Sequence, residues 1–168
     1  VGLCGALVHT LQIAKELHRR GNEITLLTRP GSWIIEPAQK AGIPVLTSEM
    51  RRYTLHDFRE VGRFCREHGI EVMLAHMSRA NNFAVWLRRF TGIPAVLRAH
   101  SHRIHFHWRM ADHVIAVSEQ TRRFHMRWNR VPPDRISTVH GFIDPERLAV
   151  ADKGARAAVR AELGLPPS

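Results

Sequence analysis

The stretch that decides the fold contains three blocks, GIPAVLRAH at residues 92–100, ADHVIAVSE at 111–119 and HGFID at 140–144. Each block combines a short apolar run with a polar or glycine-containing turn, and sequence of helical character lies between the blocks. Such runs predict the strands of a parallel sheet that is buried on both faces. Ligands bind at the carboxyl ends of such strands, where His100 and Ser118 fall. The blocks therefore predict an α/β fold with a candidate site along one edge of the sheet.

The rest of the chain repeats this alternation. Leu7, Leu11 and Leu17 recur at helical spacing before Gly21, and Ser118 is a good N-cap for the helix that follows it. We expect strands at 24–28, 43–46, 70–76, 95–99, 114–117 and 136–139, and helices at 7–20, 37–42, 54–69, 78–91, 118–129 and 154–163.

The composition is that of a soluble globular protein. Of the 168 residues, 44% are hydrophobic and 24% are charged. No apolar run approaches the ~20 residues that span a bilayer, and no signal peptide opens the sequence. The two cysteines, Cys4 and Cys65, lack the spacing of metal ligands, which fits a reducing cytoplasm. We therefore expect one domain located in the cytoplasm.

The chain has a net charge of +10, which arises mainly from arginines such as the pairs at 51–52, 88–89 and 122–123. A basic surface attracts nucleic acid, anionic lipid or phosphorylated substrates. The simpler interpretation is that the arginines cover solvated helix faces. Aromatic residues are few and the arginines form no known recognition motif, so we expect no nucleic acid partner. A basic nucleic-acid-binding domain remains the alternative from another class.

Further blocks carry a resemblance to a known family. CG at residues 4–5, followed by His9, resembles a glycine-rich first loop in which Cys4 replaces the usual first glycine. RGNEITLLTRPGS at 20–32 resembles a family segment RGHEVTLLTRPGS, and RAELGLP at 160–166 resembles R-x-ELGLP. Together with the blocks between 92 and 144, the chain resembles the amino-terminal half of a family 4 glycosyltransferase of the two-domain GT-B fold.

This resemblance implies a domain organisation and a function. Residues 1–148 are expected to form a Rossmann-like amino-terminal domain that lacks its first strand. Residues 149–168 are expected to be a linker and helix that lead to an absent second domain, so the chain alone is expected to be inactive. The implied activity is transfer of a sugar, with retention, from a nucleotide-sugar donor to a cell-envelope glycan or a lipid-linked acceptor. The alternative is a non-catalytic or half-enzyme module that needs its second domain in trans.

The resemblance also assigns roles to individual residues. His100 corresponds to a histidine close to the donor sugar and the acceptor, so we expect it to be catalytic. Gly5 and His9 correspond to the loop near the donor diphosphate, where a helix N-terminus offers free N–H groups. The remaining candidates for substrate binding line the cleft or shape the crossover between the domains: Ser118, Glu119, Gly141 and Asp144.

Histidines at 100, 102, 105 and 107 also invite a metal hypothesis, since histidines two apart on a strand point the same way. Arg98, Arg103 and Arg109 crowd this region with positive charge, and no carboxylate or cysteine stands nearby. We therefore expect no metal and no cofactor, with the nucleotide-sugar as donor substrate. Phe106 and Trp108 are predicted to form a surface that contacts the acceptor or the inner face of an anionic membrane.

Overall fold

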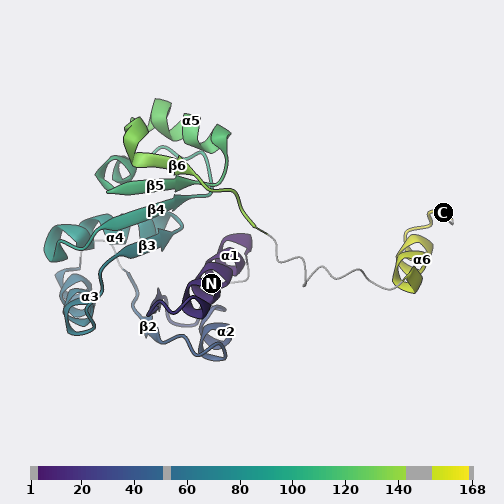
Figure 1. Ribbon diagram of the computed structural model, residues 1–168, viewed down its shortest axis with the longest axis horizontal. Helices are drawn as coiled ribbons and strands as arrows, with labels where there is room; N and C mark the ends of the chain where they lie inside the picture. Colours follow the sequence, from purple (N-terminus) through teal and green to yellow (C-terminus); the bar gives the residue numbers. More distant parts are fainter. Residues whose placement is uncertain (1–3, 51–53, 143–152, 167–168) are drawn as a thin grey trace.

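The computed structural model describes residues 4–50, 54–142 and 153–166 (Figure 1). The elements in chain order are α1 (Gly5–Arg19), β1 (Leu26–Thr28), α2 (Ile35–Gln39), β2 (Val45–Thr47), α3 (Leu55–Glu67), β3 (Met73–His76), α4 (Ser78–Thr91), β4 (Ala95–Ala99), η1 (Phe106–Met110), β5 (His113–Ala116), α5 (Glu119–Trp128), η2 (Pro133–Arg135), β6 (Ile136–Thr138) and α6 (Lys153–Glu162).

All of the described strand pairs are parallel, which confirms the predicted α/β fold of parallel strands flanked by helices. The strands form two sheets, one of two strands in the order β1-β2 and one of four strands in the order β3-β4-β5-β6. In Figure 1 the four-stranded sheet lies with α5 at one end, and β2 lies near α1 and α2. Sequential strands are neighbours within each sheet, and each connection passes through helical sequence.

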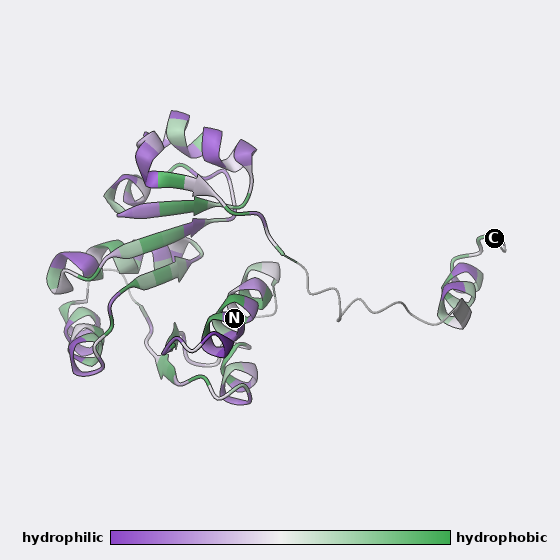
Figure 2. Ribbon diagram, viewed as in Figure 1, coloured by the Kyte–Doolittle hydropathy of each residue, from purple (hydrophilic) through white to green (hydrophobic). Residues whose placement is uncertain are grey.

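The larger sheet contains the main core. On β4, Ala95, Leu97 and Ala99 are fully buried, and Val114 on β5 is fully buried as well. Strands at the centre of a parallel sheet are covered on both faces, which is why they read as continuous apolar runs. The strands are accordingly green in Figure 2, while much of the surface of α5 is purple.

The first three strands begin later than the sequence predicts. Residues 70–72 were expected in the third strand, but β3 starts at Met73, whose partner in the register is Ala95, the first residue of β4. Residues before Met73 have no partner strand beside them, so their apolar character serves packing: Ile70 packs against the core formed by Phe58 and its neighbours. An apolar run in the sequence does not show at which residue the neighbouring strand, here β4, begins and pairing becomes possible.

A cavity of about 420 Å³ lies between the two sheets. Every residue of β1 and every residue of β3 lines it, and side chains of α1 and α4 line it as well. Because successive strand residues point to opposite faces, a lining that includes all of them means that both strands turn an edge toward the cavity. Among the described residues, the edges of β1 and β3 that face the cavity pair with no further strand.

Among the described residues, no helix combines the length and the apolar character that crossing a membrane requires.

Candidate functional site

The N-terminus of α1 forms one wall of the candidate site. Gly5 is the first helical residue, and Cys4 precedes it as an extended N-cap whose side chain makes no capping hydrogen bond. A Cβ added at Gly5 would meet nothing within 4 Å, so the backbone there is open to a ligand. The first N–H groups of a helix carry partial positive charge and lack helical partners. This arrangement suits an anionic group, and the role of Gly5 in binding one stays a prediction.

His9 lies one turn further along α1, on the same face as Gly5. Its ring centroid is 5.9 Å from that of His100 and 5.0 Å from that of Phe142. Both ring nitrogens of His9 are buried without a hydrogen-bond partner among the described residues. His9 therefore connects α1 to the end of β4, and its hydrogen-bonding capacity is unused within the described residues.

The parallel register of the large sheet brings a second histidine to His100. His76 is the last residue of β3 and pairs with Arg98 on β4, two residues before His100. The Nδ1 atom of His76 and the Nε2 atom of His100 lie 3.3 Å apart, within hydrogen-bond distance. Our sequence analysis missed His76, although it ends an apolar strand just as His100 does. We call His9, His76 and His100 the histidine cluster.

Burial and nearby positive charge keep the cluster neutral. Burial, followed by the charges of His100, Arg98 and His9, lowers the pKa of His76 to about 3. Burial, followed by the charges of Arg98 and His9, lowers the pKa of His100 to about 4. The pKa of His9 is lowered by the same causes, burial and Arg98. At neutral pH these imidazoles are therefore neutral, and His76 and His100 share a hydrogen bond as neutral rings.

Arg98 is the cation beneath the cluster, and our sequence analysis counted it only as a source of repulsion. Its side chain is 3% exposed, and one terminal nitrogen donates to the carbonyl oxygen of Val139 at 3.2 Å. Its Nε atom is buried without a partner in the described part of the chain. Burial also lowers the pKa of Arg98.

The turn after His76 is strained. Met77, which precedes α4, has a φ of 72°, a left-handed value that side chains other than glycine rarely adopt. Such backbone costs about 1–3 kcal/mol and persists where the surrounding structure fixes it. The N–H of Asn81 holds the carbonyl of Met77 at 2.9 Å. The strained turn thus fixes the direction of the backbone between His76, at the end of β3, and the start of α4.

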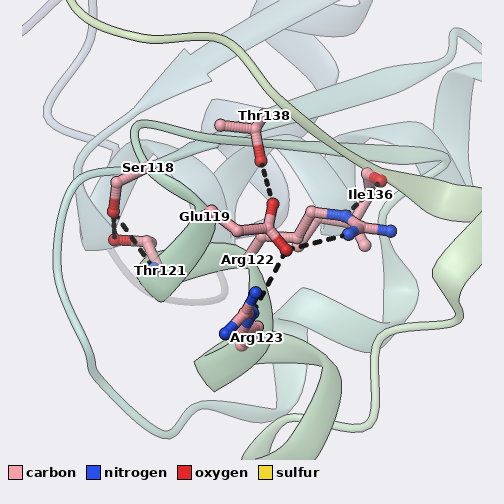
Figure 3. Close-up of polar contacts among 7 residues, drawn as sticks. All are labelled: Ser118, Glu119, Thr121, Arg122, Arg123, Ile136 and Thr138. Atoms are coloured by element: carbon pink, nitrogen blue, oxygen red, sulfur yellow. Dashed lines mark hydrogen bonds and ion pairs between the residues drawn. The ribbon is translucent and has the colours of Figure 1, made fainter.

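Ser118 and Glu119 have a structural role in the described contacts (Figure 3). The Oγ atom of Ser118 accepts from the backbone N–H of Thr121 at 3.1 Å, which confirms Ser118 as the N-cap of α5. Glu119 accepts from the hydroxyl of Thr138 at 3.0 Å and pairs with Arg122 and Arg123. The hydrogen bond from Thr138 lowers the pKa of Glu119, and Arg122 contributes to the shift. Their role in substrate binding stays a prediction.

The segment after β6 reaches α1. A Cβ added at Gly141 would lie 3.9 Å from the Nε2 atom of His9, and the ring of Phe142 packs on the same imidazole. The structure therefore brings Gly141 to the histidine cluster, as expected for a cleft residue. Asp144 lies outside the described residues.

The other histidines of the 100–107 stretch do not converge on His100. His102 stacks on Phe124, with ring centroids 4.8 Å apart, while His105 stacks on His107 at 5.1 Å. Within residues 4–50, 54–142 and 153–166, no group of three or more His, Cys, Asp or Glu side chains is arranged to hold a metal.

One expectation for the aromatic residues changes. Trp108, which we expected on a contact surface, is only 3% exposed, because it packs on His107 and His125. Phe106, two residues earlier, is 72% exposed. Trp128 is 54% exposed at the end of α5.

A parallel α/β domain with polar groups gathered at strand ends beside a helix N-terminus is a Rossmann-like ligand-binding domain. The sequence profile of Glycosyltransferase Family 4 matches residues 4–147, and the chain belongs to this family. None of the curated proteins matches it by sequence.

Solved GT-B glycosyltransferases share the fold. A glycosyltransferase from Rickettsia africae has a TM-score of 0.77 and 14% identity, over 99% of this chain and 48% of its own. HepE from Anabaena, in complex with UDP-glucose, has a TM-score of 0.76 and 16% identity, over 97% of this chain and 47% of its own. MurG from Acinetobacter baumannii has a TM-score of 0.65 and 16% identity, over 85% of this chain and 43% of its own. The chain thus spans less than half the length of each.

Proposed function

We propose that this chain is the acceptor-side half of a retaining glycosyltransferase. It would act with a nucleotide-binding domain to move a sugar from a nucleotide-sugar donor to a cell-envelope glycan or a lipid-linked acceptor. The proposed location is the cytoplasm, at the inner face of the membrane. Family membership supports glycosyl transfer, and the donor type follows the neighbour HepE, whose structure contains UDP-glucose.

The observation that carries the proposal is the histidine cluster at the strand ends, opposite the open N-terminus of α1. A neutral His100 can accept a hydrogen bond from a sugar hydroxyl at one ring nitrogen while His76 occupies the other. The N–H groups at Gly5 can stabilise the negative charge that grows on the departing diphosphate. This division of labour uses no cofactor and no metal.

Binding of the donor is the first test. In the ¹⁵N-labelled chain we expect UDP-glucose to shift the Gly5 amide and the ring nitrogens of His9 and His100, with inorganic sulfate as a control for simple charge. His100→Ala should weaken binding of the glucosyl group, while His18→Ala, at an exposed position of α1, should change nothing. Shifts confined to His18 and other exposed histidines would refute the site.

Turnover is the second test. In the chain joined to a GT-B nucleotide-binding domain, His100→Ala is expected to lower the rate about 10²–10⁴-fold, the usual contribution of polar or acid–base assistance. The variant should unfold at a slightly lower temperature, because it loses the contact with His76 at a half-buried position just after β4. An enzyme that kept its full rate after His100→Ala would refute the catalytic role.

A further inference from the structure

Beyond the histidine cluster, the molecule carries a surface that combines exposed apolar side chains with arginines. Ile104 is 65% exposed, Phe106 is 72% exposed and Trp128 is 54% exposed. Exposed arginines share the same two segments, the loop and short helix after β4 and the last turn of α5: Arg103, Arg109, Arg127 and Arg130. We call these seven residues the basic apolar patch.

Hydrogen bonds hold the two segments of the patch together. Asn129, which is 4% exposed, accepts from the N–H of His105 at 2.9 Å and donates to the carbonyl of Arg103 at 3.0 Å. The Nε2 atom of His125 lies 3.1 Å from the carbonyl oxygen of Ser101. The loop is therefore fixed against α5, and Ile104 is exposed on a supported backbone next to the end of the helix.

Among the described residues, no carboxylate forms an ion pair with an arginine of the patch. Between residues 98 and 133 the sequence contains two acidic residues, Asp112 and Glu119. Asp112 pairs with Arg88, and Glu119 pairs with Arg122 and Arg123. The arginines of the patch take part in none of the ion pairs among the described residues, so their charge faces outward.

We propose that the basic apolar patch docks the protein on an anionic phospholipid bilayer. Arginines near a negatively charged leaflet are attracted to its headgroups, and exposed apolar side chains enter the boundary of the acyl chains. Tryptophan prefers that boundary because its ring is both apolar and polar. Ile104 and Phe106 are the inserting side chains, and Trp128 lies at headgroup level.

Nucleic acid fits this surface less well. Single strands bind where open aromatic faces stack on bases inside a basic groove. Here the guanidinium of Arg127 covers the ring of Trp128 at 5.1 Å and the aliphatic Ile104 offers no ring, which leaves Phe106 as the open aromatic face of the patch. Docking through the patch adds the bilayer as a partner to the proposed function. The relevance of this docking to a lipid-linked acceptor rests on that proposed function. Vesicle binding is measured without turnover, so either proposal can fail alone.

The test is sedimentation of the 168-residue chain with vesicles of equal parts phosphatidylcholine and phosphatidylglycerol. Removing two charges by Arg103→Gln with Arg130→Gln should weaken partitioning about 30-fold, and Ile104→Ser with Phe106→Ser at least about tenfold. The matched control changes an exposed leucine and an exposed arginine on α3, Leu55→Ser with Arg59→Gln, and should bind like the unmodified chain.

Three results would overturn the proposal: equal binding to phosphatidylcholine alone, equal loss in the α3 control, or vesicle binding that depends on none of the patch residues. Preference for a single-stranded oligonucleotide over the vesicles would also overturn it. A measurement without patch variants uses Trp33→Phe, which leaves Trp128 as the exposed tryptophan in the described part of the chain. Brominated lipids should quench its fluorescence, and unchanged emission would refute the docking geometry.

Discussion

The two sheets of this molecule are built from the same kind of strand but differ in how their edges are covered. In the four-stranded sheet, β4 pairs with β3 on one side and β5 on the other, and Leu97 at its centre is fully buried. In the two-stranded sheet, β1 and β2 contain three residues each and pair only with each other. Leu27 and Leu46 remain half-buried there.

This difference shows where the stability of each sheet comes from. A pair of strands is at best marginally stable by itself, and parallel pairing is slightly weaker than antiparallel pairing. The small sheet therefore depends on the helices packed against it, through residues such as Leu7, Leu11 and Ile34. The edges of β1 and β3 that face the cavity are the weakest points of the fold.

Filling the cavity should have the largest effect. We expect an apolar strand, added ahead of residue 1 through a short glycine turn, to pair with β1 and β3. Covering about 200 Å² of apolar surface would contribute about 5 kcal/mol to the free energy of unfolding. Urea denaturation measures this gain, and hydrogen exchange should slow at the amides of β1 and β3.

The control is the same extension with a proline in the middle of the added strand, which removes one backbone donor and fixes its φ. The proline variant should show little of the gain. If both extensions stabilised the chain equally, or if exchange at β1 and β3 stayed the same, the cavity would not be a site for a strand.

Core truncation compares the sheets directly. Leu97→Ala on β4 should lower the free energy of unfolding by about 2–5 kcal/mol, as expected for a fully buried leucine. Leu46→Ala on β2 should cost less, about 1 kcal/mol, because that side chain is only half-buried. Equal losses from the two variants would mean that the small sheet is as well packed as the large one.

The sequence predicted the large sheet better than the small one, for a physical reason. Four of the five residues from Ala95 to Ala99 are apolar because β4 lies between β3 and β5 and is covered by helices, so its type and bounds could be read directly. On the small sheet the predicted strand at 24–28 shortened to Leu26–Thr28. The apolar sequence before β1 packs against α1 without pairing with another strand. An apolar pattern alone does not show whether a residue packs against a helix or pairs within a sheet.

The candidate site was predictable only in part. His100 and Gly5 stood at a strand end and at a helix start, positions that local sequence reveals. His76 and Arg98 came into the site through the register of β3 against β4, which is a property of the fold. Glu119 could be placed by its position after Ser118, but its hydrogen bond to Thr138 joins two elements that the sequence does not pair.

Acid should destabilise the four-stranded side through His76. The pKa of this imidazole is ordinarily 6.5, and in the folded chain it is lowered to about 3, mainly by burial. Its contribution is complete above pH 6.5 and declines as the pH falls toward the folded value, because the unfolded chain takes up the proton first. At pH 5 the loss is about 2 kcal/mol.

Urea denaturation at pH 7.5 and pH 5 measures this effect. One pH value lies above and the other below the pKa of histidine in the unfolded chain, about 6.5. His76→Gln should reduce the difference between the two conditions, and His18→Gln, at an exposed position on α1, should leave it unchanged. His9, Arg98 and His100 surround His76 and remain in both variants. If the difference in His76→Gln were as large as in the unmodified chain, the pKa of His76 would not be lowered in the folded state.

The smallest predicted effects concern the N-termini of α5 and α1, whose N-cap residues differ in side-chain chemistry. Ser118 caps α5 with its hydroxyl, so Ser118→Ala should lower the free energy of unfolding by about 1 kcal/mol. Cys4 begins α1 with the extended backbone of an N-cap but no side-chain bond, so Cys4→Ser should raise it by up to about 1 kcal/mol. The added cap would also compete with an anion for the first N–H groups of α1, so the same variant should bind UDP-glucose more weakly. A stabilised Cys4→Ser chain with unchanged donor binding would mean that the N-terminus of α1 is not the diphosphate site.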